Sequence, residues 1–128
     1  MDVITGLHAV TIHITDVHKA QVFYRDVLGL KEMGFSESQN RAIYALPGTN
    51  TLLTMHVQRP EEGGREPGTV SGIVFRTPDP NAACEEIKRR GGTVTVEPTL
   101  VETPGGSFYR GVFADPDGNE FIISNRKD

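Results

Sequence analysis

Apolar and polar residues alternate near the start of the chain, where Val10, Ile12 and Ile14 are separated by Thr and His. Alternation with a period of two predicts a strand that buries one face. Asp16 follows and predicts a helix N-cap, because its carboxylate can accept from the exposed backbone N–H groups of a first helical turn. Apolar residues then recur at helical spacing until Gly29, which is typical of a left-handed helix end.

Three further strand-like segments complete a first unit of one strand, one helix and three strands. They are 31–37, 41–46 and 51–57. A shift of 63 residues brings Asp16 onto Asp79, and the same order of elements follows. The expected elements of the second unit are a strand at 70–77, a helix at 80–90, and strands at 93–97, 108–114 and 119–124. The pattern therefore predicts two βαβββ modules in tandem.

The two modules are expected to form a single domain over residues 1–128, because that length suits one domain with two small halves. Module one is predicted at about 5–58 and module two at about 69–125. Residues 59–68 are polar and rich in Gly and Pro, which is typical of a solvated linker. Residues 100–107 contain Pro-Gly-Gly and are interpreted as a loop beside a cavity.

Composition excludes several classes of function. Thirteen Lys and Arg residues against seventeen Asp and Glu residues give a net charge of −4, so nucleic-acid binding is not expected. No apolar run is long enough to cross a membrane, and the N-terminus lacks the pattern of a secretory signal. The single cysteine, Cys84, excludes Cys-rich zinc sites and is interpreted as a buried, inert thiol. A cytoplasmic protein is expected.

Two motifs resemble the vicinal oxygen chelate superfamily, which includes glyoxalase I, bleomycin resistance proteins and extradiol dioxygenases. They are the helix ending Phe-Tyr-Arg-Asp-Val-Leu-Gly-Leu at 23–30 and the turn Phe-Ala-Asp-Pro-Asp-Gly-Asn at 113–119. The resemblance covers about residues 5–125. It implies the α+β glyoxalase/bleomycin resistance/dioxygenase fold, in which the curled mixed sheets of two βαβββ modules enclose a cleft. It also implies a homodimer.

The metalloenzymes of that superfamily hold a divalent metal at four strand positions in the cleft. The superfamily's spacing, counted from the N-cap residues Asp16 and Asp79, from the turn at 113–119 and along the strand at 51–57, puts those positions here on Ala9, Thr54, Gly72 and Ile122. None supplies a strong metal ligand, and Thr54 is a weak one at best. No metal cofactor is therefore expected at the superfamily's site. A divalent metal stays open as an alternative at a different place in the cleft.

Several polar residues on the strands that would line the cleft are candidates for ligand binding. They are His13, Thr54, His56, Arg76, Tyr109, Arg110 and Glu120. His56 and Glu120 are candidate catalytic residues, because a His beside a carboxylate can act as an acid–base pair; hydrogen bonding to backbone or water is the more common role of such residues.

The other candidates suggest what a ligand would contact. Arg76 and Arg110 suit an anionic ligand, because a guanidinium can make bidentate contacts. Tyr109 suits stacking on a planar ligand, whereas Phe108 is expected to pack in the core.

Two functions remain open from the sequence. The first is a glyoxalase/bleomycin-resistance-like protein that binds a small organic molecule in the sheet cleft without the superfamily's metal site. The alternative is an enzyme of the same superfamily, a glyoxalase-like lyase, isomerase or dioxygenase. Such an enzyme would use a relocated metal held by His13, His56 and Glu120, or the His56–Glu120 pair without a metal. The expected partners are a small-molecule ligand and a second copy of the chain.

Overall fold

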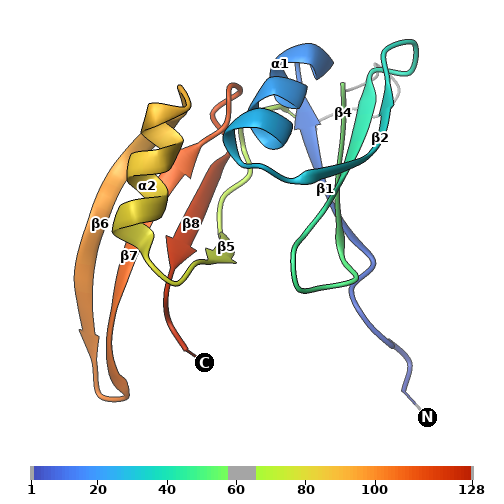
Figure 1. Ribbon diagram of the computed structural model, residues 1–128. Helices are drawn as coiled ribbons and strands as arrows, with labels where there is room; N and C mark the ends of the chain where they lie inside the picture. The colour runs from blue at the N-terminus through green and yellow to red at the C-terminus, as the bar shows by residue number, and fades with distance from the viewer. Residues whose placement is uncertain (1, 58–65, 128) are drawn as a thin grey trace. The chain divides into compact units, whose positions relative to one another are not determined.

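The computed structural model describes residues 2–57 and 66–127, which belong to two compact units (Figure 1). The first unit runs to Glu66 and the second begins at Pro67. Each contains one four-stranded mixed sheet, so the predicted α+β architecture of two βαβββ modules is confirmed. The predicted linker at 59–68 lies mostly outside the described residues, and the exact module boundaries stay a prediction. In the described part of the chain, neither module has a helix with the length and apolar content needed to span a membrane.

The first unit contains one strand, one helical segment and three further strands. Its elements are β1 (Ala9–Ile14), α1 (Val17–Gln21), the π-helix η1 (Val22–Val27), β2 (Lys31–Ser36), β3 (Arg41–Ala45) and β4 (Leu52–Val57). The strand order is β1-β4-β3-β2, with β1 parallel to β4 and the other pairs antiparallel. These bounds agree with the predicted strands to within two residues.

The helix of the first unit begins and ends where the sequence predicts. The carboxylate of Asp16 accepts from the backbone N–H groups of His18 at 2.8 Å and Lys19 at 3.1 Å. Gly29 adopts a φ of 74°, the left-handed conformation that ends a helix without a Cβ penalty. The sequence does not predict that the second half of this helix is a π-helix, in which the N–H of Leu28 donates to the carbonyl of Phe23.

The core of the first unit lies between this helical segment and one face of the sheet. Alternate residues of the strands, among them Ile12, Tyr44 and Met55, are buried on that face. The rings of Tyr24 and Tyr44 stack with centroids 5.9 Å apart, so the helix and the third strand share one aromatic contact. Because strand side chains alternate, the residues between the buried ones lie on the face away from the helix.

The second unit repeats the same order of elements. They are β5 (Ile73–Arg76), α2 (Pro80–Arg89), β6 (Thr93–Thr103), β7 (Gly106–Ala114) and β8 (Glu120–Ser124). The strand order is β5-β8-β7-β6, with β5 parallel to β8, and α2 packs against β6 and β7 (Figure 1). Stacked rings of Phe75, Phe113 and Phe121 form the centre of this core.

The prediction of a loop at 100–107 is wrong. The strands β6 and β7 continue to pair as far as Thr103 and Gly106, so the connection shrinks to a two-residue turn. The physical reason is that apolar residues face one another across the two strands, with Leu100 opposite Tyr109 and Val101 opposite Phe108. The Pro-Gly-Gly sequence forms the tight turn of a hairpin, in which Gly106 has a φ of 129°.

Candidate functional site

Each sheet has a far face, which we define as the face turned away from the helix of its own unit. In the first sheet the far face consists of the strand residues that alternate with the buried Ile12, Leu53 and Met55. These far-face residues are Ala9, Thr11 and His13 of β1, Leu52, Thr54 and His56 of β4, and Arg41, Ile43 and Ala45 of β3. The face therefore combines apolar, hydroxyl and basic side chains.

Two pairs of polar residues meet across β1 and β4 on this face. The hydroxyl oxygens of Thr11 and Thr54 lie 2.8 Å apart and share a hydrogen bond. One step along the strands, the imidazole rings of His13 and His56 lie edge to face with centroids 4.7 Å apart. The Nδ1 of His56 is also 3.3 Å from its neighbouring carbonyl, that of Val57. The structure thus brings together three of the predicted site residues: His13, Thr54 and His56.

The far face of the second sheet carries an apolar row beside a basic row. Val74 of β5, Ile122 of β8 and Val112 of β7 lie in register across neighbouring strands. Two residues further along, Arg76, Ser124 and Arg110 form the next row in the same strand order. Glu120 occupies the same face at the start of β8, on the other side of the apolar row.

Tyr109 lies on the opposite side of the β6–β7 hairpin from Arg110, because successive strand residues point to opposite faces. Its side chain is 39% exposed and faces Leu100 across the hairpin. Its backbone N–H donates to the side chain of Asn125 at 2.8 Å. Phe108, one residue earlier, lies under the guanidinium of Arg126 at 5.5 Å. The structure therefore does not place Tyr109 with the two arginines.

The proposed acid–base pair of His56 and Glu120 joins two different units. His56 belongs to β4 in the first unit, whereas Glu120 begins β8 in the second. Within its own unit, the imidazole of His56 contacts the imidazole of His13. The pairing of His56 with Glu120 stays a prediction.

The four positions that the superfamily uses for metal binding do not fit a metal here. Ala9 and Ile122 are strand residues with hydrocarbon side chains, and Gly72 precedes β5 with a φ of 92° and no side chain at all. The hydroxyl of Thr54 is engaged with Thr11. Over residues 2–57 and 66–127, no group of three or more His, Cys, Asp and Glu side chains is arranged to hold a metal ion. The donor atoms at those positions are therefore insufficient for the superfamily's metal chemistry.

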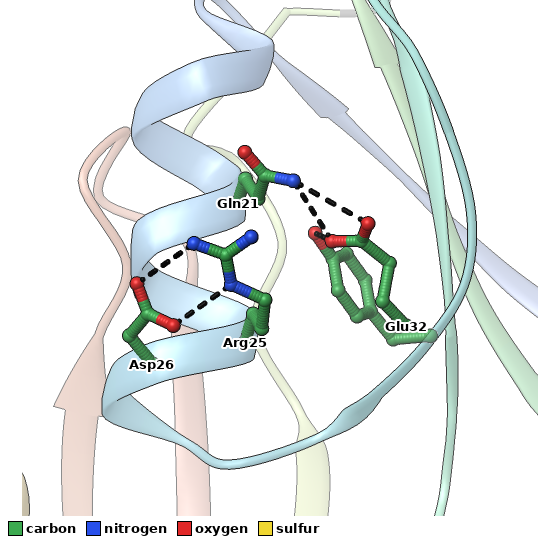
Figure 2. Close-up of polar contacts among 5 residues, drawn as sticks. Gln21, Arg25, Asp26 and Glu32 are labelled. Atoms are coloured by element: carbon green, nitrogen blue, oxygen red, sulfur yellow. Dashed lines mark hydrogen bonds and ion pairs between the residues drawn. The ribbon is translucent and has the colours of Figure 1, made fainter.

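A polar cluster on the helix side of the first sheet is absent from the sequence predictions. Figure 2 shows Gln21 pointing towards Glu32, which accepts from its amide at 3.0 Å, while Arg25 pairs with Asp26. The buried hydroxyl of Tyr44 donates to the same carboxylate at 3.3 Å. Burial raises the pKa of Tyr44 above its ordinary value, and the nearby charge of Glu32 adds a smaller increase. These contacts tie the helical segment to β2 and β3, so we assign the cluster to the fold.

Cys84 agrees with the sequence predictions, whereas Ser124 is a site residue that they did not include. Cys84 is fully buried in α2, as predicted, and burial raises the pKa of its thiol. Ser124 was not predicted as a site residue, although it alternates with Glu120 and Ile122 and therefore lies on their face. Its place between Arg76 and Arg110 depends on strand register, which the sequence alone does not give.

Comparisons with known proteins agree with this fold. The chain matches the family described as the Glyoxalase/Bleomycin resistance protein/Dioxygenase superfamily over residues 6–123. A solved member of that superfamily from Sphaerobacter thermophilus DSM 20745 is 31% identical, with a TM-score of 0.77 over 94% of this chain and 97% of the other. TnmS3, an antibiotic binding protein from Streptomyces sp. CB03234, is 25% identical, with a TM-score of 0.76 over 96% and 97% of the two chains.

A glyoxalase/bleomycin resistance protein from the same Streptomyces strain is also 25% identical, with a TM-score of 0.70 over 92% of this chain and 98% of the other. The search among curated proteins returned no match. The similarities therefore come from the family and from solved structures, and they extend over nearly the whole chain.

Proposed function

The chain belongs to the Glyoxalase/Bleomycin resistance protein/Dioxygenase superfamily, and from this membership we propose that it binds a small organic molecule without the superfamily's metal site. The ligand would lie against the far face of the second sheet, with its apolar body on the hydrocarbon side chains. The polar and basic side chains of that face would orient it. The protein would act by binding and sequestering this molecule.

The observation that carries this proposal is the composition of the far faces. On the second sheet, Val74 is 59% exposed although it lies in a strand beside Ile122, and Arg76 follows on the same face. Ligand sites typically combine apolar surface with a few polar groups that fix orientation, and these faces have both. The residues at the four metal positions favour binding over metal-assisted chemistry, because three of them lack any ligand atom.

The similar proteins also support the binding of a small organic molecule. TnmS3 is an antibiotic binding protein, and another of the similar structures is a glyoxalase/bleomycin resistance protein. Both cover more than nine tenths of this chain. We therefore include antibiotics with a planar or apolar body among the ligands to be tested first.

The test is binding of N-phenyl-1-naphthylamine, a neutral aromatic probe whose fluorescence rises in apolar surroundings. We expect saturable binding with one site per chain. Val74→Asn should weaken it about fivefold, because apolar contact area is lost from the far face. The matched control is Val22→Asn, since Val22 is similarly exposed at 53% but lies on the helical segment.

Two outcomes would contradict the proposal. One is the absence of saturable binding to the natural sequence by this probe and by a panel of planar antibiotics. The other is an equal loss of affinity in the two valine variants, which would show that the probe adheres to exposed apolar residues without a site.

The sequence-based expectations of a homodimer and of a cytoplasmic location are part of this proposal. In each sheet the outer strands, such as β2 and β6, pair on one side only within the described residues, so their outer edges are available to a second copy. Light scattering coupled to size-exclusion chromatography tests the dimer. A mass near 14.0 kDa, that of one chain, would contradict it.

A second candidate function is favoured by one specific observation, the approach of His13 to His56. Imidazole is a common ligand of divalent metals, and two rings with centroids 4.7 Å apart on neighbouring strands can bind one ion. The candidate is an enzyme of the superfamily with its metal moved from the usual positions to this pair.

Metal analysis of protein purified without a His tag and without chelator tests this candidate. Near one Zn, Mn, Fe or Ni per chain, lost in His13→Ala and His56→Ala but retained in the control His18→Ala, would establish the relocated metal site that this enzyme requires. No bound metal after incubation with these ions would exclude it. His18 is a suitable control because it lies exposed on α1, away from β1 and β4.

A further inference from the structure

Two arginines on the far face of the second sheet flank one buried serine. Arg76 of β5 and Arg110 of β7 are both register partners of Ser124 in β8, which lies between them. Register partners on neighbouring strands project to the same side of a sheet. The two guanidinium groups therefore rise from the same face, one on each side of the Ser124 hydroxyl.

The spacing of these residues suits a single small anion. Neighbouring strands lie about 4.8 Å apart, so the backbones of Arg76 and Arg110 are separated by roughly 10 Å. Long arginine side chains can close that gap from both sides and contact one oxyanion with charged N–H groups. The Ser124 hydroxyl oxygen accepts from the backbone N–H of Arg126 at 3.0 Å, and this bond holds the hydroxyl in place between the two arginines.

The two arginines of this row carry their positive charge on exposed side chains. Both arginines are exposed, and no ion pair joins either of them to a carboxylate in the part of the chain that is described. By contrast, Arg89 on α2 forms an ion pair with Glu86. Glu120 shares the far face, but it lies four residues from Ser124, about 13 Å along the strand.

The apolar row lies directly beside the two arginines. Val74 and Ile122 are two residues from Arg76 and Ser124 on the same strands, a separation of about 7 Å. An aromatic or aliphatic body of modest size spans that distance. The far face of the second sheet therefore matches a molecule that has an apolar body and one anionic end.

We infer that the ligand carries a carboxylate or sulfonate group, bound by Arg76 and Arg110 over Ser124, while its apolar body covers Val74 and Ile122. This inference rests on the proposed function and names its ligand class. The chain as a whole is acidic, with a net charge of −4, so an anionic ligand needs a local basic site of this kind to overcome repulsion at long range.

The experiment compares two probes that share one aromatic framework. 8-Anilino-1-naphthalenesulfonate is N-phenyl-1-naphthylamine with one sulfonate added. We expect Arg76→Gln and Arg110→Gln each to weaken binding of the sulfonate probe about tenfold, because charge-assisted hydrogen bonds are lost. Both variants should leave binding of the neutral probe within twofold. Arg89→Gln is the matched control and should change neither.

The possible results separate the inference from the proposed function. If both probes bind and the arginine variants change neither affinity, the anionic ligand class is wrong while small-molecule binding stands. If neither probe binds, the proposed function fails and this inference fails with it. Competition by inorganic phosphate at the concentration of the probe would also contradict the inference, since phosphate has no apolar body. Unchanged urea midpoints in the variants exclude a loss of folding.

Discussion

The side-chain amide of Asn119 donates to Oδ2 of Asp115 across 2.9 Å, and both side chains are buried. The other carboxylate oxygen, Oδ1, accepts from the backbone N–H groups of Asp117 and Asn119. The amide oxygen of Asn119 accepts from the N–H of Val70 at 3.1 Å. The Asp-Pro-Asp-Gly-Asn motif therefore ties the β7–β8 turn to the segment before β5 and has a structural role.

Asn119→Ala should destabilise the protein by about 2–3 kcal/mol, because it leaves the part-buried N–H of Val70 without its acceptor and removes a donor to a buried carboxylate. Urea unfolding followed by circular dichroism measures the change. Asn81→Ala is the control, since Asn81 is exposed in the first turn of α2 and should shift stability by less than about 0.5 kcal/mol. Equal losses in the two variants would show that the buried network adds nothing.

The repeat in the sequence predicts the two helices, but it does not predict the π-helix in the first. The left-handed glycine that ends each helix is Gly29 in one case and Gly91 in the other. Gly29 comes thirteen residues after its N-cap, Asp16, whereas Gly91 comes twelve after Asp79. The first helix therefore accommodates one extra residue between the same two end signals. A π-turn absorbs one residue in this way, and apolar spacing alone does not reveal it.

Strand faces were predictable from alternation, whereas pairing register was not. Alternation correctly places His13 and His56 on the face away from the helix. In the second unit, Arg76 and Arg110 lie on β5 and β7, as the predicted strands place them. The contact between the two imidazoles and the position of Ser124 between the arginines both depend on which residues are partners across strands. Register is set by the packed core and by bulges such as those in β6, so it becomes visible only in the folded unit.

In the hairpin of β6 and β7, the sequence prediction was wrong because it relied on turn-forming residues alone. Pro104 and the glycines after it predicted a loop, but the cross-strand contact of Leu100 with Tyr109 extends the ladder up to the turn. Tyr109 immediately precedes Arg110 in β7, a strand that the sequence also predicts, so alternation places their two side chains on opposite faces.

The N-cap of the first helix predicts a specific dependence on pH. Hydrogen bonds, the strongest from the N–H of Lys19, lower the pKa of Asp16 in the folded protein. Its stabilising contribution is therefore complete above the pKa of an unfolded aspartate, about 4, and is lost as the pH falls through the lower folded value. The thermal midpoint of Asp16→Ala should lie below that of the natural sequence at pH 7, and this gap should shrink at pH 2–3.

Asp16→Asn separates charge from capping. Asparagine keeps a side-chain oxygen for the N–H groups but does not titrate, so the gap between this variant and Asp16→Ala should be the same at both pH values. Other carboxylates titrate equally in all three proteins and cancel in the comparison. A gap between the natural sequence and Asp16→Ala that is independent of pH would contradict the assignment of the lowered pKa to this cap.

Cys84 should be inert in the folded protein. It is fully buried in α2, and burial, followed by the nearby charge of Glu97, raises the pKa of its thiol. Reaction with 5,5′-dithiobis(2-nitrobenzoate) at pH 8 should be slow without denaturant and immediate in guanidinium chloride. The double variant Cys84→Ser/Ala82→Cys moves the thiol to an exposed position of the same helix and should react at once. Equally fast reaction of the natural sequence would show that α2 opens readily.

Gly68 and Gly48 provide a matched pair for separating backbone strain from steric overlap. Both have a φ in the left-handed region, 79° for Gly68 and 75° for Gly48. A Cβ on Gly68 would overlap the carbonyl oxygen of Asp117, whereas a Cβ on Gly48 would meet nothing within 4 Å. Because Asp117 is part of the hydrogen-bonded turn between Asp115 and Asn119, its carbonyl cannot move without disturbing that network.

Gly48→Ala should therefore cost about 1 kcal/mol, the strain of placing alanine at a positive φ. Gly68→Ala should cost that strain and a further loss of about 1–3 kcal/mol, because a backbone oxygen must shift to admit the methyl group. Urea unfolding of the two variants measures both values on the same scale. If the two losses are equal, the backbone around Gly68 relaxes freely and the turn at Asp117 is not held as rigidly as its hydrogen bonds indicate.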